Sequence, residues 1–251
     1  MEFECGLECI KSPHRGFPLI PLKDTTPRRS FPIVTLLLIL ANVVVFVHQI
    51  MLPAPAQEAF IRTYSVVPRK IQLALEGHHY SLAQAFIPLF TSMFLHGGFL
   101  HILGNMWFLW IFGANVEDRM GRAAYLFFYI VCGVASGIAQ MMFSWGSNIP
   151  SLGASGAISG VLGAYIVLFP GSRILTLVPL FIIWFTARIP AAIFIGLWFI
   201  MQFLSGVGSI NSPGAANAGG VAWWAHVGGF LVGFFLARGA AGGRRATASY
   251  G

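Results

Sequence analysis

Six apolar stretches run through this chain, and each is long enough, or nearly long enough, to cross a membrane as a helix. An apolar run needs about 20 residues to span the hydrocarbon of a bilayer. Only 9% of the 251 residues are charged, whereas a soluble domain is typically about 25% charged. The sequence therefore predicts an all-α polytopic membrane protein, a bundle of six transmembrane helices, with spans at residues 31–52, 98–114, 123–143, 155–169, 190–205 and 222–237.

A further apolar stretch, from Ile174 to Phe185, is open to more than one interpretation. A seventh span is one alternative. Its length is more typical of an interfacial or re-entrant segment. The sequence therefore predicts six spans, with this stretch at the membrane surface or only partly within it.

The positive charges indicate how the chain is oriented, because short cytoplasmic loops of membrane proteins carry an excess of Lys and Arg. With six spans and a cytoplasmic N-terminus, 12 of the 15 Lys and Arg residues fall on the cytoplasmic side; Arg62, Arg69 and Lys70 fall outside. The net charge of +7 is thus a topology signal, and no nucleic acid is expected as a partner. Both termini are expected in the cytoplasm. The bilayer is expected to be the plasma membrane, which is the inner membrane in a Gram-negative cell.

The spans divide the chain into three parts. Residues 1–30 are polar, lack the compact apolar core of a signal peptide, and predict a mobile cytosolic tail. Residues 31–237 form the predicted membrane domain, and residues 238–251 a cytosolic tail that is expected to be disordered from residue 239. Within the membrane domain, residues 53–90 predict an interfacial segment with short helices, and the Gly-rich residues 206–221 a flexible external loop.

Cysteine usage gives no sign of a disulfide or of a metal site. Cys5, Cys9 and His14 are fewer than the four ligands of a closed zinc site, so free cytosolic thiols are expected. Cys132 is typical of a small apolar residue within a span. The sequence predicts no metal and no cofactor.

Polar residues are costly in hydrocarbon, and here they gather where the second, fourth and sixth spans begin. His101 and Asn105 lie near the start of the second, Ser155 starts the fourth, and His226 follows the start of the sixth. Each of these spans enters from outside, so all four residues are predicted in the outer leaflet. His101 and Asn105 share one helix face, whereas His96 does not, which disfavours a two-histidine metal site.

Ser155 and His226 each have a structural interpretation beside a chemical one. A serine at a helix start is commonly an N-cap, and a histidine in a span can simply bond a backbone carbonyl. Their shared depth favours the chemical interpretation, in which the imidazole takes the serine proton and returns it to the leaving amine. No Asp or Glu lies in a span apart from Glu117 and Asp118 at a cytoplasmic end, so the sequence indicates a dyad.

Glycines support close approach of the fourth and sixth spans. Gly156 with Gly160, and Gly229 with Gly233, are spaced so that two helices can pack backbone to backbone, which would bring the serine and the histidine within reach. Gly153, two residues before the serine, lets a substrate backbone come close.

The combined pattern resembles the rhomboid family of intramembrane serine proteases over residues 90–237. The matching residues occur in the family's order, and they are His96, His101, Asn105, Glu117, Arg119, Gly121, Gly153, Ala154, Ser155, Gly156, Ala225, His226, Gly229 and Gly233.

The resemblance implies a six-helix bundle in which Ser155 is the nucleophile and His226 the general base. It also implies an oxyanion hole lined by His101, Asn105 and the Ser155 amide, with His96 in support. Substrates would be single-pass transmembrane proteins, cleaved at or near small residues in a helix that unwinds easily.

Two positions depart from the family pattern. Family members often carry Trp-Arg in the first external loop, where this chain has Ile87 and Pro88. Some members also place an aromatic residue one turn after the nucleophile, where it stacks on the histidine; this chain has Ser159 there, which is expected to be a helix-packing hydroxyl.

The leading hypothesis is an intramembrane serine protease whose site opens to the external side, with the fifth helix and its loop as the gate. A second hypothesis is a catalytically silent relative that binds transmembrane clients. A third, a small-solute transporter, is disfavoured because inverted repeats and midplane polar groups are not visible.

Overall fold

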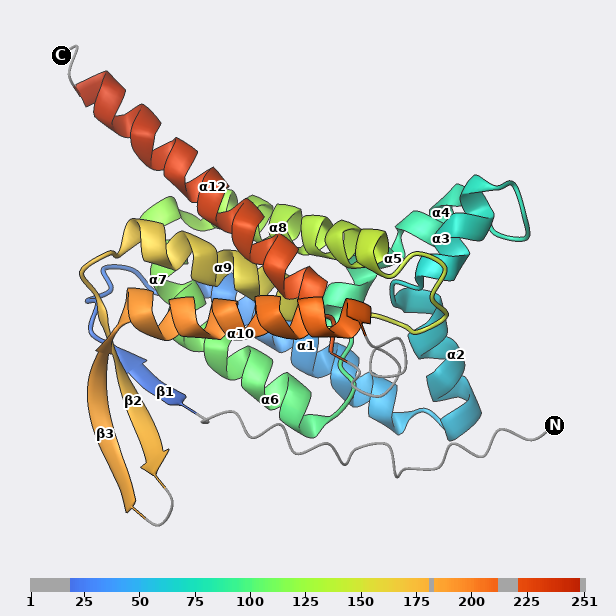
Figure 1. The fold of residues 1–251 in the computed structure, drawn as a ribbon, viewed down its shortest axis with the longest axis horizontal. Helices are drawn as coiled ribbons and strands as arrows, with labels where there is room; N and C mark the ends of the chain where they lie inside the picture. Colours follow the sequence, from blue (N-terminus) through green and yellow to red (C-terminus); the bar gives the residue numbers. More distant parts are fainter. Residues whose placement is uncertain (1–18, 181–182, 212–220, 249–251) are drawn as a thin grey trace.

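The computed structural model of the chain describes residues 19–180, 183–211 and 221–248, so Cys5, Cys9 and His14 lie outside the described residues. It is mostly helical, with a small sheet at one end of the helix bundle and short helices at the other (Figure 1). The helices are α1 (Ile33–Met51), α2 (Ala54–Tyr64), α3 (Pro68–Leu75), α4 (Leu82–Phe86), α5 (Pro88–Thr91), η1 (Ser92–Phe94), α6 (Phe99–Phe108), η2 (Leu109–Gly113), α7 (Ala114–Met120), α8 (Arg122–Phe143), α9 (Ser155–Leu168), α10 (Ala191–Asn211) and α12 (Trp223–Ala248). The strands are β1 (Ile20–Asp24), β2 (Arg173–Leu180) and β3 (Ile183–Pro190).

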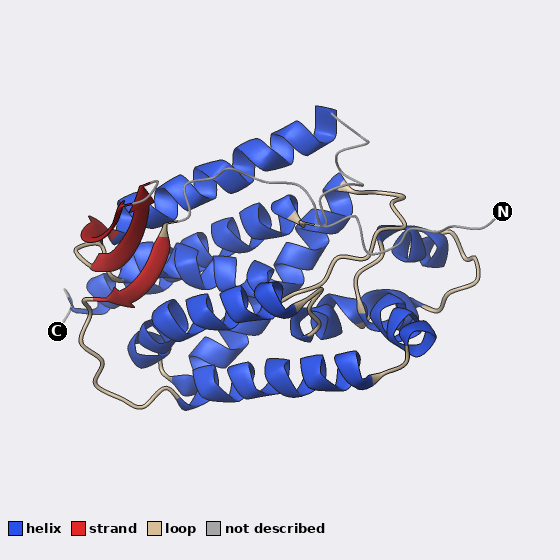
Figure 2. Ribbon diagram, turned by 90° about the horizontal axis from the view of Figure 1, so that it is seen from below, coloured by secondary structure: helices blue, strands red, loops and turns tan. Residues whose placement is uncertain are grey.

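Each predicted span coincides with a helix or with a continuous run of helices. Four of them are long and apolar enough to cross a membrane: α1, α8, α10 and the run α6–η2–α7. The other two predicted spans correspond to α9 and α12. These helices lie side by side in two views (Figures 1 and 2). The prediction of a helical, polytopic membrane protein is confirmed.

The short helix α9 lies inside the bundle. Its 14 residues make about 21 Å of helix, less than the roughly 30 Å of a hydrocarbon core. Every residue from Gly156 to Tyr165 is buried, because α8, α10, α12 and η2 pack against this helix. Protein therefore surrounds the first turn of α9, and Ser155 at its start lies within the bundle.

The glycine pairs hold α9 and α12 at backbone contact, as the sequence predicted. A Cβ added to Gly229 would lie 2.1 Å from the carbonyl oxygen of Gly156, and one added to Gly233 would lie 2.1 Å from that of Gly160. No larger side chain fits at such a separation. The distance between these two helices is thus set by the absence of side chains.

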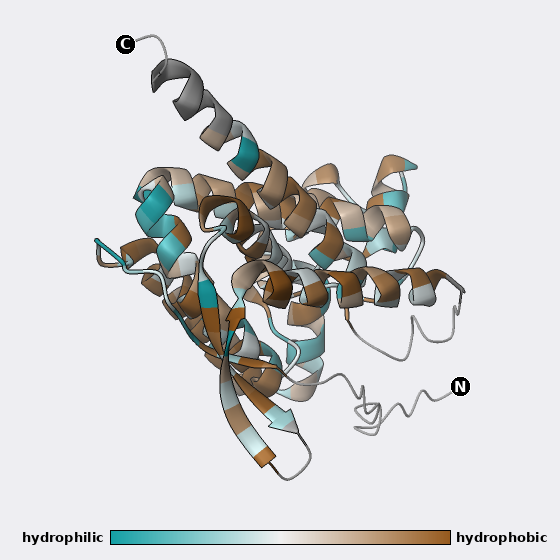
Figure 3. Ribbon diagram, turned by 60° about the vertical axis from the view of Figure 1, so that its left-hand side comes forward, coloured by the Kyte–Doolittle hydropathy of each residue, from teal (hydrophilic) through white to brown (hydrophobic). Residues whose placement is uncertain are grey.

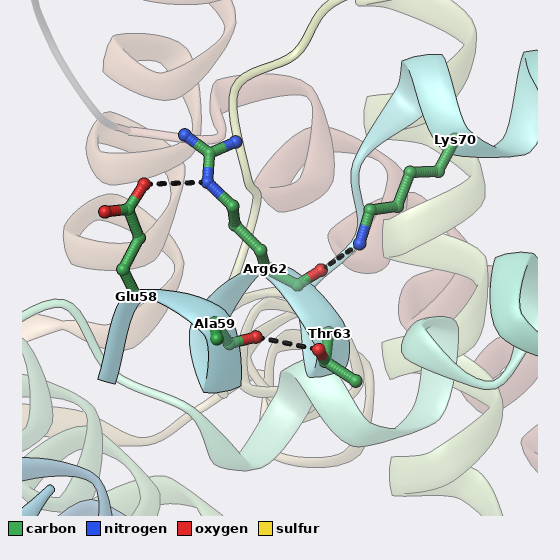
Figure 4. A network of polar contacts seen from close by, with 5 residues as sticks. All are labelled: Glu58, Ala59, Arg62, Thr63 and Lys70. Atoms are coloured by element: carbon green, nitrogen blue, oxygen red, sulfur yellow. Dashed lines mark hydrogen bonds and ion pairs between the residues drawn. The ribbon is translucent and has the colours of Figure 1, made fainter. Parts of the chain in front are cut away.

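The segment between the first two spans contains the predicted short helices. In α2, Arg62 forms an ion pair with Glu58 at 2.9 Å, and Thr63 donates a hydrogen bond to the carbonyl oxygen of Ala59 at 2.7 Å (Figure 4). Lys70 of α3 donates to the carbonyl oxygen of Arg62 at 2.5 Å. The first two contacts lie within α2, and the Lys70 contact joins α3 to α2 at the end of the bundle opposite the sheet.

A three-stranded antiparallel sheet, in the order β1-β2-β3, replaces two sequence predictions. The stretch from Ile174 to Phe185 is neither a span nor a re-entrant helix, because β2 and β3 pair as a hairpin along their whole length. Most residues of the stretch are β-branched or aromatic, and from Phe185 to Ile189 apolar residues alternate with Thr186 and Arg188, which suits a strand. Residues 20–24, placed in a mobile tail by the sequence, form the strand that pairs with β2.

The C-terminal prediction also changes. The sequence indicated disorder from residue 239, but α12 continues without a break to Ala248. Ala and Arg, which favour helices, occupy much of this last stretch. The predicted loop at residues 206–221 is likewise shortened, because α10 extends to Asn211; residues 212–220 lie outside the described part of the chain.

Two carboxylates join the elements at the sheet end. Glu117 accepts hydrogen bonds from the backbone N–H groups of Val34 and Thr35, at 2.9 and 2.8 Å, and from the Thr35 hydroxyl at 2.8 Å. Asp24 of β1 accepts from Tyr165 of α9 at 2.7 Å and from Asn115 of α7 at 2.5 Å. Glu117 thereby supplies acceptors to the first turn of α1, and Asp24 fixes the sheet to the bundle.

Candidate active site

Ser155 begins α9, so its hydroxyl lies at the helix N-terminus, where the helix dipole favours developing negative charge. Gly153, two residues earlier, has φ +124°, a conformation that residues with a side chain rarely adopt. The Gly153 N–H donates to the carbonyl oxygen of Ser92 at 2.9 Å. The backbone just before the serine is thus bent and held in place.

His226 lies beside Ser155. Its Nε2 is 2.8 Å from the Ser155 Oγ, across the close contact between α12 and α9. The beginning of α12 is fixed from α8, because the Gln140 side chain accepts a hydrogen bond from the Ala225 N–H at 3.2 Å. The structure therefore brings together the two residues that the sequence singled out, at hydrogen-bonding distance.

Gln202 of α10 contacts the other ring nitrogen of His226, with its Oε1 2.6 Å from Nδ1. An amide oxygen can only accept, so this contact places the ring proton on Nδ1 and leaves Nε2 free to accept from the serine. Sequence reasoning considered only carboxylates as a third member and missed this residue. The available signal was depth, since in the predicted orientation the fifth span leads outward, which would put an amide in its second half in the predicted leaflet of Ser155.

His101 and Asn105 of α6 meet the chain at Gly153. A Cβ on Gly153 would lie 2.8 Å from Cε1 and 2.9 Å from Nε2 of His101, and 3.6 Å from Nδ2 of Asn105. The Asn105 Nδ2 is buried and has no hydrogen-bond partner among the described residues. Both side chains therefore lie within a few ångströms of the segment that leads into Ser155.

His96 precedes α6 and is completely buried, with its ring 5.1 Å from that of His101 in an edge-on arrangement. Gln49 of α1 holds the His96 backbone, donating to its carbonyl oxygen at 2.7 Å and accepting from its N–H at 3.4 Å. His96 thus packs behind His101. Among the described residues, no group of three His, Cys, Asp or Glu side chains is placed to hold a metal ion.

The Ser159 hydroxyl donates to the carbonyl oxygen of Ser155 at 2.6 Å, one turn earlier in the same helix, whereas the sequence predicted a helix-packing hydroxyl. Aromatic rings reach His226 from other helices. The Trp198 ring of α10 lies 5.8 Å from the imidazole at a tilt of 37°, and the Trp223 ring lies edge-on at 6.4 Å. The histidine therefore has aromatic neighbours without an aromatic residue at position 159.

This arrangement contains the parts needed for acyl transfer. A hydroxyl contacts a histidine nitrogen that can accept its proton, and an amide fixes the orientation of the ring. Side-chain donors from α6 and backbone N–H groups at the start of α9 lie on the approach to the serine. The fold and these groups define a membrane-embedded protein with a serine–histidine pair inside its helix bundle.

The comparisons with known proteins agree with that class. The family model described as the rhomboid domain matches residues 83–241, which is more than half of the chain. The chain belongs to the rhomboid family, which includes intramembrane proteases.

Individual relatives match a smaller part. The chain is 32% identical over 152 residues to rhomboid protein 1, mitochondrial, of Saccharomyces cerevisiae, covering 59% of this chain and 40% of that protein. It is 32% identical over 149 residues to rhomboid protease GluP of Bacillus subtilis, covering 59% and 25%. It is 36% identical over 90 residues to presenilin-associated rhomboid-like protein A, mitochondrial, of Danio rerio, covering 35% and 24%. The matches thus span less than half of each relative's length.

Proposed function

We propose that this protein is an intramembrane serine protease that hydrolyses peptide bonds in or beside the transmembrane segments of single-pass membrane proteins. The observation that carries the proposal is the 2.8 Å contact between His226 Nε2 and Ser155 Oγ at the start of α9. Family membership supports it, since one matched relative is the rhomboid protease GluP.

The reaction follows from the roles of these groups. The Ser155 oxygen attacks the scissile carbonyl carbon while its proton passes to His226 Nε2. The C–N bond breaks, the histidine returns the proton to the leaving amine, and an acyl-enzyme remains. Water then attacks the ester with the same histidine as base, which releases the new carboxyl end and restores the serine.

We assign oxyanion stabilisation to the donors near Gly153. Asn105 Nδ2, the His101 ring and the Ser155 N–H would donate to the negative oxygen of the tetrahedral intermediate. His96 supports the His101 ring from behind, and Gly153 leaves room for the substrate backbone. Preorganised donors of this kind cost no rearrangement at the moment of reaction.

The proposal includes an orientation in the membrane. The site lies toward the α2–α5 end, and the exposed cations Arg119, Arg122, Arg173 and Arg188 lie toward the sheet end. By the positive-inside rule, the site opens to the external side and both termini are cytoplasmic, in the plasma membrane. A membrane-impermeant maleimide applied to whole cells should label Ser147→Cys, in the connection between α8 and α9, but not Thr186→Cys in β3.

A fluorophosphonate probe tests the chemistry, because it reacts only with an activated serine. Purified protein in liposomes should be labelled, and Ser155→Ala should not be. Ser159→Ala is the matched control, since it removes a buried hydroxyl one turn away, and its labelling should equal that of the parent. Equal labelling of the parent and Ser155→Ala would refute the assignment of the nucleophile, and a parent that cleaves no single-span substrate would leave the client-binding hypothesis.

A further inference from the structure

Gln202 connects the histidine of the site to α10, a helix that meets the bundle along one side. Its packing is mainly against α12, with Phe199 stacked on Phe230 at 4.3 Å. Its other side exposes apolar side chains such as Leu197 and Met201. Of its apolar membrane-spanning stretch 22% is buried, compared with 28% for α1 and for α8 and 50% for the run α6–η2–α7. The position of α10 is therefore less restrained than that of the helices that carry Ser155 and Asn105.

The Gln202 contact has a chemical consequence for His226. Neutral imidazole carries one ring proton, and the nitrogen facing Ser155 must lack it to accept the serine proton. Gln202 Oε1, 2.6 Å from Nδ1, favours the tautomer with the proton on Nδ1. An amide does this without placing a charge in the membrane interior, where an ionised carboxylate would be costly.

We propose that Gln202 is a positioning residue, and that His226 has the correct tautomer and orientation only while α10 is packed on α12. This inference rests on the proposed function. A displacement of α10 that separates Oε1 from Nδ1 would leave the ring free to rotate and to exchange tautomers. Activity then depends on the position of the helix that lies between the site and the lipid.

Three variants test this role. Gln202→Met keeps the size of the side chain but removes the acceptor, and it should lower kcat about 100-fold with little change in KM, as expected for a misplaced reacting group. Gln202→Glu keeps an acceptor and stabilises the protonated imidazole, so activity should persist at alkaline pH and the acidic limb of the pH profile should move to higher pH. Met201→Leu, on the exposed side of α10, is the control and should behave as the parent.

Dependence on helix packing is tested by Phe199→Ala, which removes the stacked contact with Phe230 and should lower kcat in the same direction as Gln202→Met. In the double variant the two effects should not add, because both break one contact. If Gln202→Met keeps the kcat and pH profile of an active parent, the inference fails and the proposed function stands. If the parent itself is not labelled at Ser155, the proposed function fails.

The β2–β3 hairpin supports a second proposal that does not depend on the active site. Opposed residues of an antiparallel pair share a face, and successive residues alternate. The register therefore places Ile174, Phe185 and Ile183 on one face, and Thr186 and Arg188 on the other. Lys23 of β1, opposite Leu175, shares the face of Arg188. One face of the hairpin is therefore apolar, whereas the other combines the basic residues with Leu177 and Trp184.

The apolar face changes its surroundings along its length. Near the helices Ile174 is 0% exposed, whereas Phe185 and Ile183 toward the hairpin turn are 46% and 68% exposed. The hairpin runs across the direction of the helices and extends past them (Figures 1 and 3). The face that covers the bundle at one end thus continues beyond it, where the described residues cover it only in part.

We infer that the outer part of this face lies against the bilayer, at the boundary between headgroups and acyl chains. The hairpin joins α9 to α10, so it begins and ends where two spans leave the membrane. The exposed side chains of Lys23, Arg173 and Arg188 complement anionic headgroups.

Site-directed fluorescence tests this placement in a variant whose three cysteines are replaced. An environment-sensitive dye on Phe185→Cys should be quenched by lipids that carry a nitroxide about 5–10 Å below the surface, and protected from aqueous iodide. The same dye on the neighbouring Thr186→Cys should show the reverse. In anionic lipid, positions 185 and 186 should differ more in quenching by nitroxide and by iodide than in neutral lipid. Arg188→Gln should reduce this effect of anionic lipid.

Two outcomes would overturn the inference. If iodide quenches positions 185 and 186 equally, the hairpin stands in water. If position 185 is protected from both quenchers and forms disulfides between chains at low protein-to-lipid ratio, the face binds a second copy instead of lipid. Near-equal thermal midpoints for the two labelled variants serve as the folding control.

Discussion

The two ends of the helix bundle both bury polar side chains, but the partners of those side chains differ. At the sheet end, the Glu117 carboxylate accepts three hydrogen bonds and Asp24 accepts two, although Asn115 Oδ1 there is buried without a partner among the described residues. Near Ser155, both ring nitrogens of His96 and the Asn105 Nδ2 are buried without a partner among the described residues. The two carboxylates have their donors in place and so hold structural elements together. The donors near Ser155 lack an acceptor in the protein, which suits an acceptor that arrives with the substrate.

The largest expected difference between the two ends is the effect of a change at His226 on kcat. His226→Ala removes the proposed base, and kcat should fall about 10⁴-fold or more, as for other members of serine catalytic groups. The thermal midpoint should change little, because the side chain contributes few structural hydrogen bonds. Kinetics with a single-span substrate and thermal unfolding of the same preparation check both statements. If His226→Ala kept its activity, the polar groups near Ser155 would have no catalytic role, and the proposed difference between the two ends would be wrong.

Asn105→Ala comes next. Loss of one oxyanion donor should lower kcat about 100-fold to 1,000-fold, with KM and thermal midpoint close to those of the parent. A control is Asn115→Ala at the sheet end, which removes an amide that donates to Asp24 and should affect the midpoint and not kcat. If the two amides give the same pattern, the distinction between the ends is wrong.

At the sheet end, Glu117→Ala should show the opposite pattern. The Val34 and Thr35 N–H groups would lose their acceptor inside the protein, and the free energy of unfolding should fall by about 3 kcal/mol. Activity per folded molecule should remain. Denaturant titration in detergent, together with active-serine labelling of the folded fraction, measures the two quantities separately. A large loss of labelling in the folded fraction would contradict the purely structural role.

The smallest expected effect is a pH dependence from Asp24. Burial raises the pKa of this carboxyl above its usual value of 3.8, although its hydrogen bonds with Tyr165 and Thr26 oppose the shift. The protonated form is therefore favoured by folding, so its contribution to stability is present below pH 3.8 and is lost as pH rises through the folded-state pKa. Asp24→Asn should lack this loss, and thermal midpoints from pH 3.5 to 7 should fall less steeply than in the parent. Parallel curves would show that Asp24 does not titrate in this range.

The sequence was most informative where membrane physics limits the choices. Span positions follow from apolar length, and the proximity of Ser155 and His226 followed from shared depth and small-residue spacing. Gln202 was missed because its depth indicates only where in the span the amide lies, and nothing in the sequence indicates which side chain it contacts. The sheet was not predicted for another reason. Strand β1 pairs with a strand about 150 residues away, and no local sequence pattern specifies such a partner. The membrane identity, the orientation and the domain boundaries remain predictions.

The pairing of β1 with β2 also orders the assembly of the protein. Asp24 and Tyr165, which share a hydrogen bond, are 141 residues apart in the chain. At a synthesis rate of about 5–20 residues per second, β1 leaves the ribosome roughly 7–30 s before its partners exist. The first strand must therefore wait unpaired while α1, α8 and α9 are made and inserted, and the sheet closes only after the fourth span. Completion of this sheet is therefore a late step in biogenesis, because β1 can pair only after β2 has been made.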